Sequence, residues 1–194
     1  YPGVSSDNSQ KQVIAVGRYV PQKGFDRLIP AWKIVSEQHP DWTLRIYGDG
    51  MREKLQQQID SLGISSNCVL EHSVPNIVDK YCESSIFVLS SRFEGFGMVI
   101  IEAMACGVPP VSFTCPCGPR DIITDSKDGL LVENGDIEGL AGKICYLIEN
   151  EKVRKEMGKQ ARINVERFKI EHVAQEWREL FETLTKQPYS DQLS

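Results

Sequence analysis

Several features that would define a function class are scarce or missing in this sequence. It has only three histidines, and it contains neither a Gly-x-Ser-x-Gly motif nor a Ser-His-Asp arrangement, which argues against a serine hydrolase. No apolar run approaches the roughly 18 residues that a membrane-spanning helix needs. The formal net charge of −5 argues against a nucleic-acid-binding protein, which would usually be basic. With 194 residues, of which 41% are hydrophobic and 25% charged, the composition indicates one ordinary globular domain.

The six cysteines lack the paired spacing of a zinc site. Cys115 and Cys117 are the only close pair, whereas structural zinc sites usually combine two such pairs. A chain of this length buries enough apolar surface to fold without disulfides. We therefore expect reduced, mostly buried cysteines and no metal site.

Short apolar runs alternate with amphipathic segments along the chain. The runs predict six strands, at residues 12–17, 42–47, 68–70, 85–89, 110–113 and 130–132. The other segments predict helices at 25–35, 51–62, 77–84, 94–106, 137–149, 151–168 and 170–185, with Asp136 as an N-cap and Pro30 in a first turn or at a kink. This alternation predicts an α/β fold: a Rossmann-like, doubly wound parallel sheet of about six strands with helices on both faces.

The loops rich in glycine and polar residues all follow predicted strands. They comprise residues 17–24, 48–50, 72–75, 90–97 and 114–120. In doubly wound sheets, ligands bind outside the carboxyl ends of the strands. The sequence therefore predicts that these loops converge on a single cleft.

Residues 91–109 carry two glutamates eight positions apart, Glu94 and Glu102. We expect Glu94 and Gly95 to open a helix that places Gly95, Met98 and Glu102 on one face. Glycines at a helix start expose backbone N–H groups, which suit an anion or a ligand hydroxyl. The alternative is that Glu94 complements the helix dipole and Glu102 is solvated, although a charge within an apolar run needs a partner.

Arg18 and Lys23 follow the first predicted strand and lie in a loop between Gly17 and Gly24. Two fixed cations at a strand end would stabilise a diphosphate leaving group, because charge-assisted contacts contribute about 1.5–3 kcal/mol each. The loop is not a P-loop, since Lys23 precedes Gly24 and no Ser or Thr follows. The alternative is a pair of solvated cations beside a turn.

The run Glu-Gly-Phe-Gly-Met-Val-Ile-Ile-Glu at 94–102, followed by Ala-Met-Ala-Cys-Gly-Val-Pro, resembles the Glu-x7-Glu signature of family 4 of the retaining glycosyltransferases. These enzymes have the GT-B fold, and the loop Gly-Arg-x4-Lys-Gly at 17–24 also matches their pattern. The resemblance covers roughly residues 11–185. It implies catalytic roles for Glu94 at the donor sugar and for Arg18 and Lys23 at the diphosphate, while Glu102 binds the ribose hydroxyls.

The resemblance also implies which residues bind the nucleotide sugar through their backbone. They are Gly17, Gly24, Val74, Gly95, Phe96, Gly97 and Gly118, with Val74 at the base. Val74 stands where the family usually has glycine. The family's Gly-Gly-x-x-Glu loop is replaced at 115–121 by a Gly-Pro-Arg form similar to that of some bacterial polysaccharide transferases. The alternative for this loop is a rigid, proline-rich turn with a helix cap.

The resemblance implies the C-terminal, donor-binding domain of a transferase for capsular polysaccharide, lipopolysaccharide or exopolysaccharide. Such an enzyme moves a sugar from a nucleoside diphosphate, most often UDP, to a glycan or lipid-linked acceptor without a metal or other cofactor. We expect a linker at 1–11, the nucleotide-sugar-binding domain at 12–185 and a disordered tail at 186–194. The acceptor domain would precede this chain, so we expect the fragment to fold alone, bind nucleotide weakly and be inactive. The location would be cytoplasmic, peripheral to the inner membrane face in the full-length protein.

Two other functions remain open at this point. One is a non-catalytic, nucleotide-binding regulatory module, and the other is a GT-B sugar-nucleotide epimerase. A phosphorylase would need a lysine motif for pyridoxal phosphate, which we do not find.

Overall fold

The computed structural model describes residues 5–186 and contains one parallel sheet of six strands. The strands are β1 (Gln12–Val16), β2 (Thr43–Tyr47), β3 (Cys68–Glu71), β4 (Ile86–Leu89), β5 (Pro110–Phe113) and β6 (Leu130–Val132). Their order is β3-β2-β1-β4-β5-β6, and every pair of neighbours is parallel. The predicted doubly wound sheet is confirmed, and the order reverses between β1 and β4.

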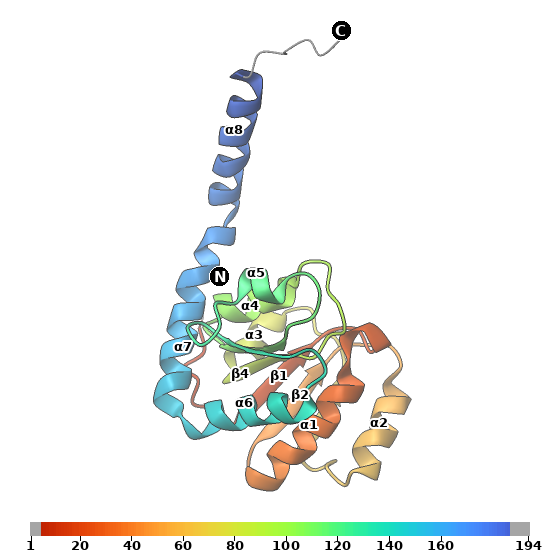
Figure 1. Ribbon diagram of the computed structural model, residues 1–194. Coiled ribbons are helices and arrows are strands. Elements are labelled where there is room, and N and C mark those ends of the chain that lie inside the picture. Colours follow the sequence, from red (N-terminus) through yellow and green to blue (C-terminus); the bar gives the residue numbers. More distant parts are fainter. Residues whose placement is uncertain (1–4, 187–194) are drawn as a thin grey trace.

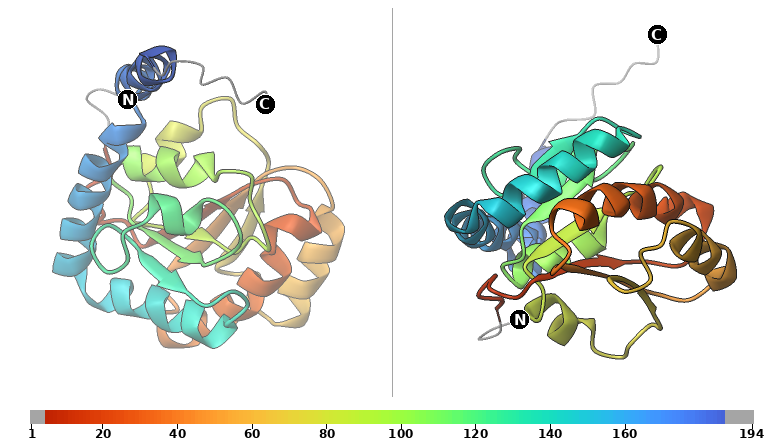
Figure 2. Two further views of the ribbon diagram at one scale, coloured as in Figure 1. Left: turned by 45° about the horizontal axis from the view of Figure 1, so that its top comes forward. Right: turned by 90° about the horizontal axis from the view of Figure 1, so that it is seen from below.

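Helices cover both faces of this sheet (Figure 1). They are α1 (Phe25–Gln38), α2 (Arg52–Ser61), α3 (Ile77–Cys82), α4 (Met98–Ala105), α5 (Pro119–Ile122), α6 (Ile137–Glu149), α7 (Glu151–Asn164) and α8 (Ile170–Lys186), with 3-10 turns η1 (Pro21–Lys23) and η2 (Val165–Phe168). Seen from below, α1, α2 and α6 lie on one side, and α3 and α4 lie on the other (Figure 2).

The alternation of side chains along the strands builds two apolar cores. Val13 and Ala15 of β1 point into the core under α1, α2 and α6. Ile14 points to the opposite face, where it joins Phe87 of β4 and Met104 of α4. Because successive side chains of a strand face opposite sides, a fully apolar run such as β1 requires cover on both faces.

The helix after β4 begins later than the sequence predicts. We expected it to open at Glu94, but α4 starts at Met98 and Gly97 is its N-cap, with a φ of 95°. The backbone N–H of Glu94 donates instead to the carbonyl oxygen of Pro116, 3.1 Å away. Because the left-handed backbone of Gly97 interrupts the helix, Gly95 lies in a loop, and the expected helix face holding Gly95 with Met98 and Glu102 is wrong for Gly95.

We expected Pro30 in the first turn of a helix or at a kink. It lies inside α1, beyond the first turn. A proline has no N–H, so the carbonyl of Asp26, four residues earlier, loses its helical partner. Gln58 of α2 supplies one, because its Nε2 donates to that carbonyl at 2.9 Å. The predicted N-cap at Asp136 is confirmed, since its Oδ1 accepts from the N–H of Gly139 at 2.8 Å.

The predicted terminal segments fall partly outside the described residues. Of the linker predicted at 1–11, residues 5–11 are described, and here Asn8 is buried and its carbonyl accepts two hydrogen bonds from Arg154. Of the tail predicted at 186–194, Lys186 ends α8 and the rest lies outside. The predicted helix at 151–168 is divided into α7 and η2, and α8 extends away from the sheet (Figure 1). The short helix α5 was not predicted.

Candidate functional site

The candidate site lies where the strand order reverses. β1 and β4 are neighbours at this point, with Ile14 paired to Phe87. The loops that leave their carboxyl ends, residues 17–24 and 90–97, therefore start side by side and lead to helices on opposite faces. Such a reversal point is the usual ligand-binding crevice of a doubly wound sheet.

Lys23 and Glu94 meet across this point. The Nζ of Lys23 lies 2.8 Å from Oε1 and 3.0 Å from Oε2 of Glu94. The two side chains are only 15% and 7% exposed. Ser91 donates a further hydrogen bond from its Oγ to Oε1 of Glu94 at 2.5 Å. Removing one partner of such a largely buried ion pair is destabilising, because the other charge stays buried without a counter-ion.

Glycines allow the loops around this pair to approach closely. Gly24 has a φ of 65°, and a Cβ there would lie 2.0 Å from the carbonyl oxygen of Ser90. Gly118 has a φ of 96°, and a Cβ there would lie 2.0 Å from the carbonyl oxygen of Phe96. These two glycines therefore serve loop packing in the structure, whereas Gly95 has open space around it.

A cleft of about 650 Å³ opens beside the pair. It is lined by Val16, Gly17, Arg18, Tyr47, Gly48, Asp49, Gly50, Ser73, Val74 and Ile77. Gly17 connects the cleft to the ion pair, because a Cβ at Gly17 would lie 3.1 Å from Cδ of Lys23. Of the predicted site residues, Gly17, Arg18 and Val74 line the cleft, and Arg18 is exposed there. Lys23 and Glu94 are not among the lining residues and adjoin the cleft through Gly17.

Glu102 lies in the second turn of α4 and is partly buried. Its Oε2 accepts a hydrogen bond from the hydroxyl of Tyr81 of α3 at 3.2 Å. Within residues 5–186 it makes no ion pair or hydrogen bond with Arg18 or Lys23. The charge expected to need a partner has a phenol hydroxyl as that partner rather than a cation.

Three residues of the predicted converging loops 48–50 and 72–75, to which the sequence assigned no binding role, meet at the rim of the cleft. Asp49 accepts hydrogen bonds from the hydroxyl and the N–H of Ser73, and lies 2.9 Å from Nδ1 of His72. The hydrogen bonds from Ser73 and His72 lower the pKa of the Asp49 carboxyl. This cluster ties the loop after β3, which carries Val74, to the loop after β2. Their position after strands predicts that the two loops converge, but it does not reveal the hydrogen bonds between them.

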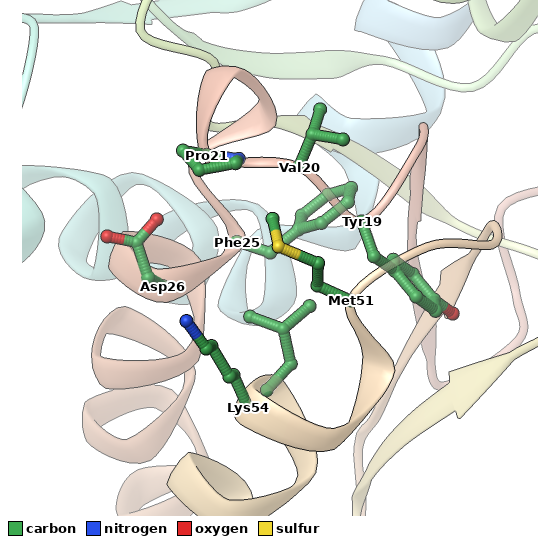
Figure 3. A pocket seen from close by; sticks show the side chains of 8 residues that line it. Tyr19, Val20, Pro21, Phe25, Asp26, Met51 and Lys54 are labelled. Atoms are coloured by element: carbon green, nitrogen blue, oxygen red, sulfur yellow. The ribbon is translucent and has the colours of Figure 1, made fainter.

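A smaller pocket of about 170 Å³ lies between the 17–24 loop, α1 and α2. Its lining is almost wholly apolar, with Tyr19, Val20, Phe25 and Met51 around it (Figure 3). Figure 3 shows the charged ends of Asp26 and Lys54 on one side of the pocket. None of the residues predicted to bind nucleotide points into this pocket, since Gly17, Arg18 and Lys23 are not among its lining residues.

Among residues 5–186, no group of three or more His, Cys, Asp or Glu side chains is arranged to hold a metal ion. The six cysteines are all free thiols, of which four are buried and Cys117 is exposed. In the same part of the chain, none of the helices has the length and apolar character to traverse a membrane.

Comparison with known proteins identifies the class. The family model described as Glycosyl transferases group 1 matches residues 3–164. The chain is 33% identical over 172 residues to the amylovoran biosynthesis glycosyltransferase AmsD of Erwinia amylovora. The aligned region covers 88% of this chain and 48% of that protein. The chain therefore belongs to the group 1 glycosyltransferases, and its sheet is the Rossmann-like unit of the GT-B fold.

Two solved structures give the same result. A Staphylococcus aureus TarM mutant, solved with fondaparinux, α-GlcNAc-glycerol and UDP, superposes with a TM-score of 0.85 at 31% identity, covering 93% of this chain and 36% of that one. The C-terminal domain of the group 1 protein LpcC from Francisella tularensis gives a TM-score of 0.75 at 26% identity and covers 86% and 89%. The chain thus spans less than half of AmsD and TarM, but nearly the whole of the isolated LpcC domain.

Proposed function

We propose that this chain is the nucleotide-sugar-binding half of a retaining glycosyltransferase of family 4. The observation that carries the proposal is the contact between Lys23 and Glu94 beside the cleft lined by Gly17, Arg18 and Val74. A diphosphate requires a cation, a sugar hydroxyl requires an acceptor such as a carboxylate, and a nucleobase requires an apolar cleft. UDP is the nucleotide we propose, and TarM, a related protein, was solved with UDP.

In this proposal each side chain keeps the role that the family resemblance implies. Arg18 and Lys23 neutralise the diphosphate, and Glu94 orients the donor sugar. Glu102 accepts hydrogen bonds from the ribose, oriented by Tyr81. The backbone of Val74 meets the base, and the exposed backbone at Gly95 to Gly97 approaches the sugar. No metal or other cofactor takes part, since Arg18 and Lys23 supply the positive charge.

The proposed reaction breaks the bond between the anomeric carbon and the diphosphate oxygen. A bond from the same face of the sugar forms to the acceptor hydroxyl, whose proton passes to the leaving phosphate. Lys23 and Arg18 stabilise the negative charge that grows on the diphosphate in the transition state. The acceptor would be a glycan or lipid-linked hydroxyl in bacterial polysaccharide synthesis at the inner membrane face, bound by a domain that this chain does not include.

Crystals of this chain soaked with UDP-glucose and UDP-GlcNAc test the proposal. We expect density for the base beside Val74 and for the diphosphate between Arg18 and Lys23, and the same occupancy after treatment with EDTA. A nucleotide bound elsewhere, or a site that fills only when a divalent metal is added, would contradict it. We also expect binding without sugar transfer, so measured transferase turnover by this chain alone would overturn the role assigned to the other half.

A further inference from the structure

Arg92 joins the two loops that carry the ion pair. From the loop after β4, its Nη1 and Nη2 donate to Oδ1 and Oδ2 of Asp26 at 2.8 and 2.6 Å. Nη1 also donates to the carbonyl oxygen of Pro21 at 2.6 Å. The guanidinium thus makes a two-point contact with a carboxylate and caps a carbonyl at the start of η1. Its contact with Asp26 lowers the pKa of that carboxyl and raises its own.

The backbones of the same two loops are also hydrogen-bonded to one another. The N–H of Arg92 donates to the carbonyl oxygen of Gln22 at 2.8 Å. The side-chain amide of Gln22 donates back to the carbonyl oxygen of Phe93 at 3.1 Å. Lys23 follows Gln22 directly and Glu94 follows Phe93 directly. These bonds therefore set the distance between the backbones from which the ion pair projects.

We propose that Arg92 is a positioning residue for the diphosphate, acting through Lys23. We call the contacts of the Arg92 guanidinium with Asp26 and with the Pro21 carbonyl the clamp. The inference rests on the proposed function, because it assigns the clamp to the phosphate end of the same site. With η1 fixed by Arg92, the Lys23 side chain runs along Gly17, which lines the cleft, and its ammonium is held on the Glu94 carboxylate. A loop that is already ordered loses less entropy on binding, so the diphosphate gains affinity.

The geometry requires arginine specifically. A planar guanidinium reaches both oxygens of Asp26 and the Pro21 carbonyl together, whereas an ammonium on a flexible stem cannot match all three acceptors. Arg92 is 32% exposed and Asp26 47% exposed, so the ion pair by itself adds little to overall stability. The effect of Arg92 on nucleotide binding through Lys23 can therefore be measured separately from its effect on the stability of the fold.

The test compares UDP with UMP, which lacks the second phosphate. Calorimetric titrations of both nucleotides are made with the wild type, Arg92→Lys, Arg92→Ala and Asp26→Asn. Arg27→Ala is the matched control, because Arg27 lies on the same helix turn and, within residues 5–186, its side chain hydrogen bonds only to Asn134, at 3.3 Å. We expect the ratio of UDP to UMP affinity to fall about ten-fold in all three clamp variants, with UMP affinity within about two-fold of wild type.

The Lys23→Ala background separates positioning from general damage to the fold. If Arg92 acts through Lys23, Arg92→Ala changes the UDP-to-UMP ratio less than two-fold in that background. An equal loss of UDP and UMP affinity, or a full ten-fold effect without Lys23, would overturn the inference and leave the proposed function standing. A wild type that binds neither nucleotide would instead overturn the proposed function itself.

Discussion

The ammonium of Lys23 lies 2.8 and 3.0 Å from the two carboxylate oxygens of Glu94, although 71 residues separate them in the sequence. The contact crosses the point where the strand order reverses, so it joins a loop of one half of the sheet to a loop of the other. In the proposed function, an incoming diphosphate must share this ammonium with Glu94. On that proposal, the strength of the pair affects how strongly nucleotide binds.

Glu94→Gln should strengthen UDP binding. The substitution keeps the shape of the side chain, frees Lys23 from its counter-ion and removes a negative charge near the diphosphate. We expect a gain of about 1 kcal/mol, or about five-fold in affinity, by calorimetry at low salt. Glu53→Gln makes the same change of charge on the exposed face of α2 and serves as the control. Weaker UDP binding by Glu94→Gln would contradict the competition.

Gly24→Ala should destabilise the protein far more than Gly63→Ala. Both glycines have a left-handed φ, 65° and 67°, so both substitutions incur the same strain of about 1–2 kcal/mol. A Cβ at Gly24 would also lie 2.0 Å from the carbonyl oxygen of Ser90, whereas Gly63 has nothing within 4 Å. Urea unfolding of both variants measures the difference, and equal losses would contradict the close packing of the two loops.

The pairing of Asp26 with Arg92 should appear in the pH dependence of stability. Arg92 holds the pKa of Asp26 below its ordinary value of 3.8. The ionised form then contributes stability above the unfolded pKa, and this contribution is lost as the pH falls through the folded pKa. Below about pH 5, the free energy of unfolding should fall slightly more steeply in the wild type than in Asp26→Asn, by less than about 1 kcal/mol because the pair is partly exposed. Parallel slopes in the two proteins would contradict the pairing.

Cys117 should be the thiol that reacts first in the native protein. It is exposed, whereas burial raises the pKa of Cys68 and Cys106 to about 12 and of Cys115 to about 11. A thiol with a raised pKa holds little thiolate, which is the reactive form. Labelling with an aromatic disulfide at pH 8 should show one fast thiol that Cys117→Ser removes. A fast phase that survives in Cys117→Ser would contradict the burial.

The sheet and its binding edge could be predicted from the sequence because they depend on local patterns. Apolar runs such as 12–17 and 85–89 predict buried strands, and the glycine-rich loops after them predict the edge that binds ligand. The meeting of Lys23 with Glu94 follows in outline from this topology. Their direct pairing does not, because it depends on how two loops pack at Gly24 and Ser90.

Other parts of the site depend on contacts between distant residues, which a single sequence does not reveal. The start of α4 moves from Glu94 to Met98 because Gly97 has a left-handed φ of 95°, which no helix interior allows, and Phe96 before it packs closely against Gly118 of another loop. The clamp between Arg92 and Asp26 joins the loop after β4 to the first turn of α1. Both features place the predicted residues differently without changing the predicted edge of the sheet.

Titration of UDP into Lys23→Ala tests the central claim most directly. Lys54→Ala removes the same charge from the rim of the smaller pocket and is the matched control. Loss of a charge-assisted contact to the diphosphate should weaken binding by about 1.5–3 kcal/mol in Lys23→Ala, or roughly ten- to 150-fold, and leave Lys54→Ala unchanged. Unchanged UDP affinity in folded Lys23→Ala would contradict the assignment of this edge as the diphosphate site.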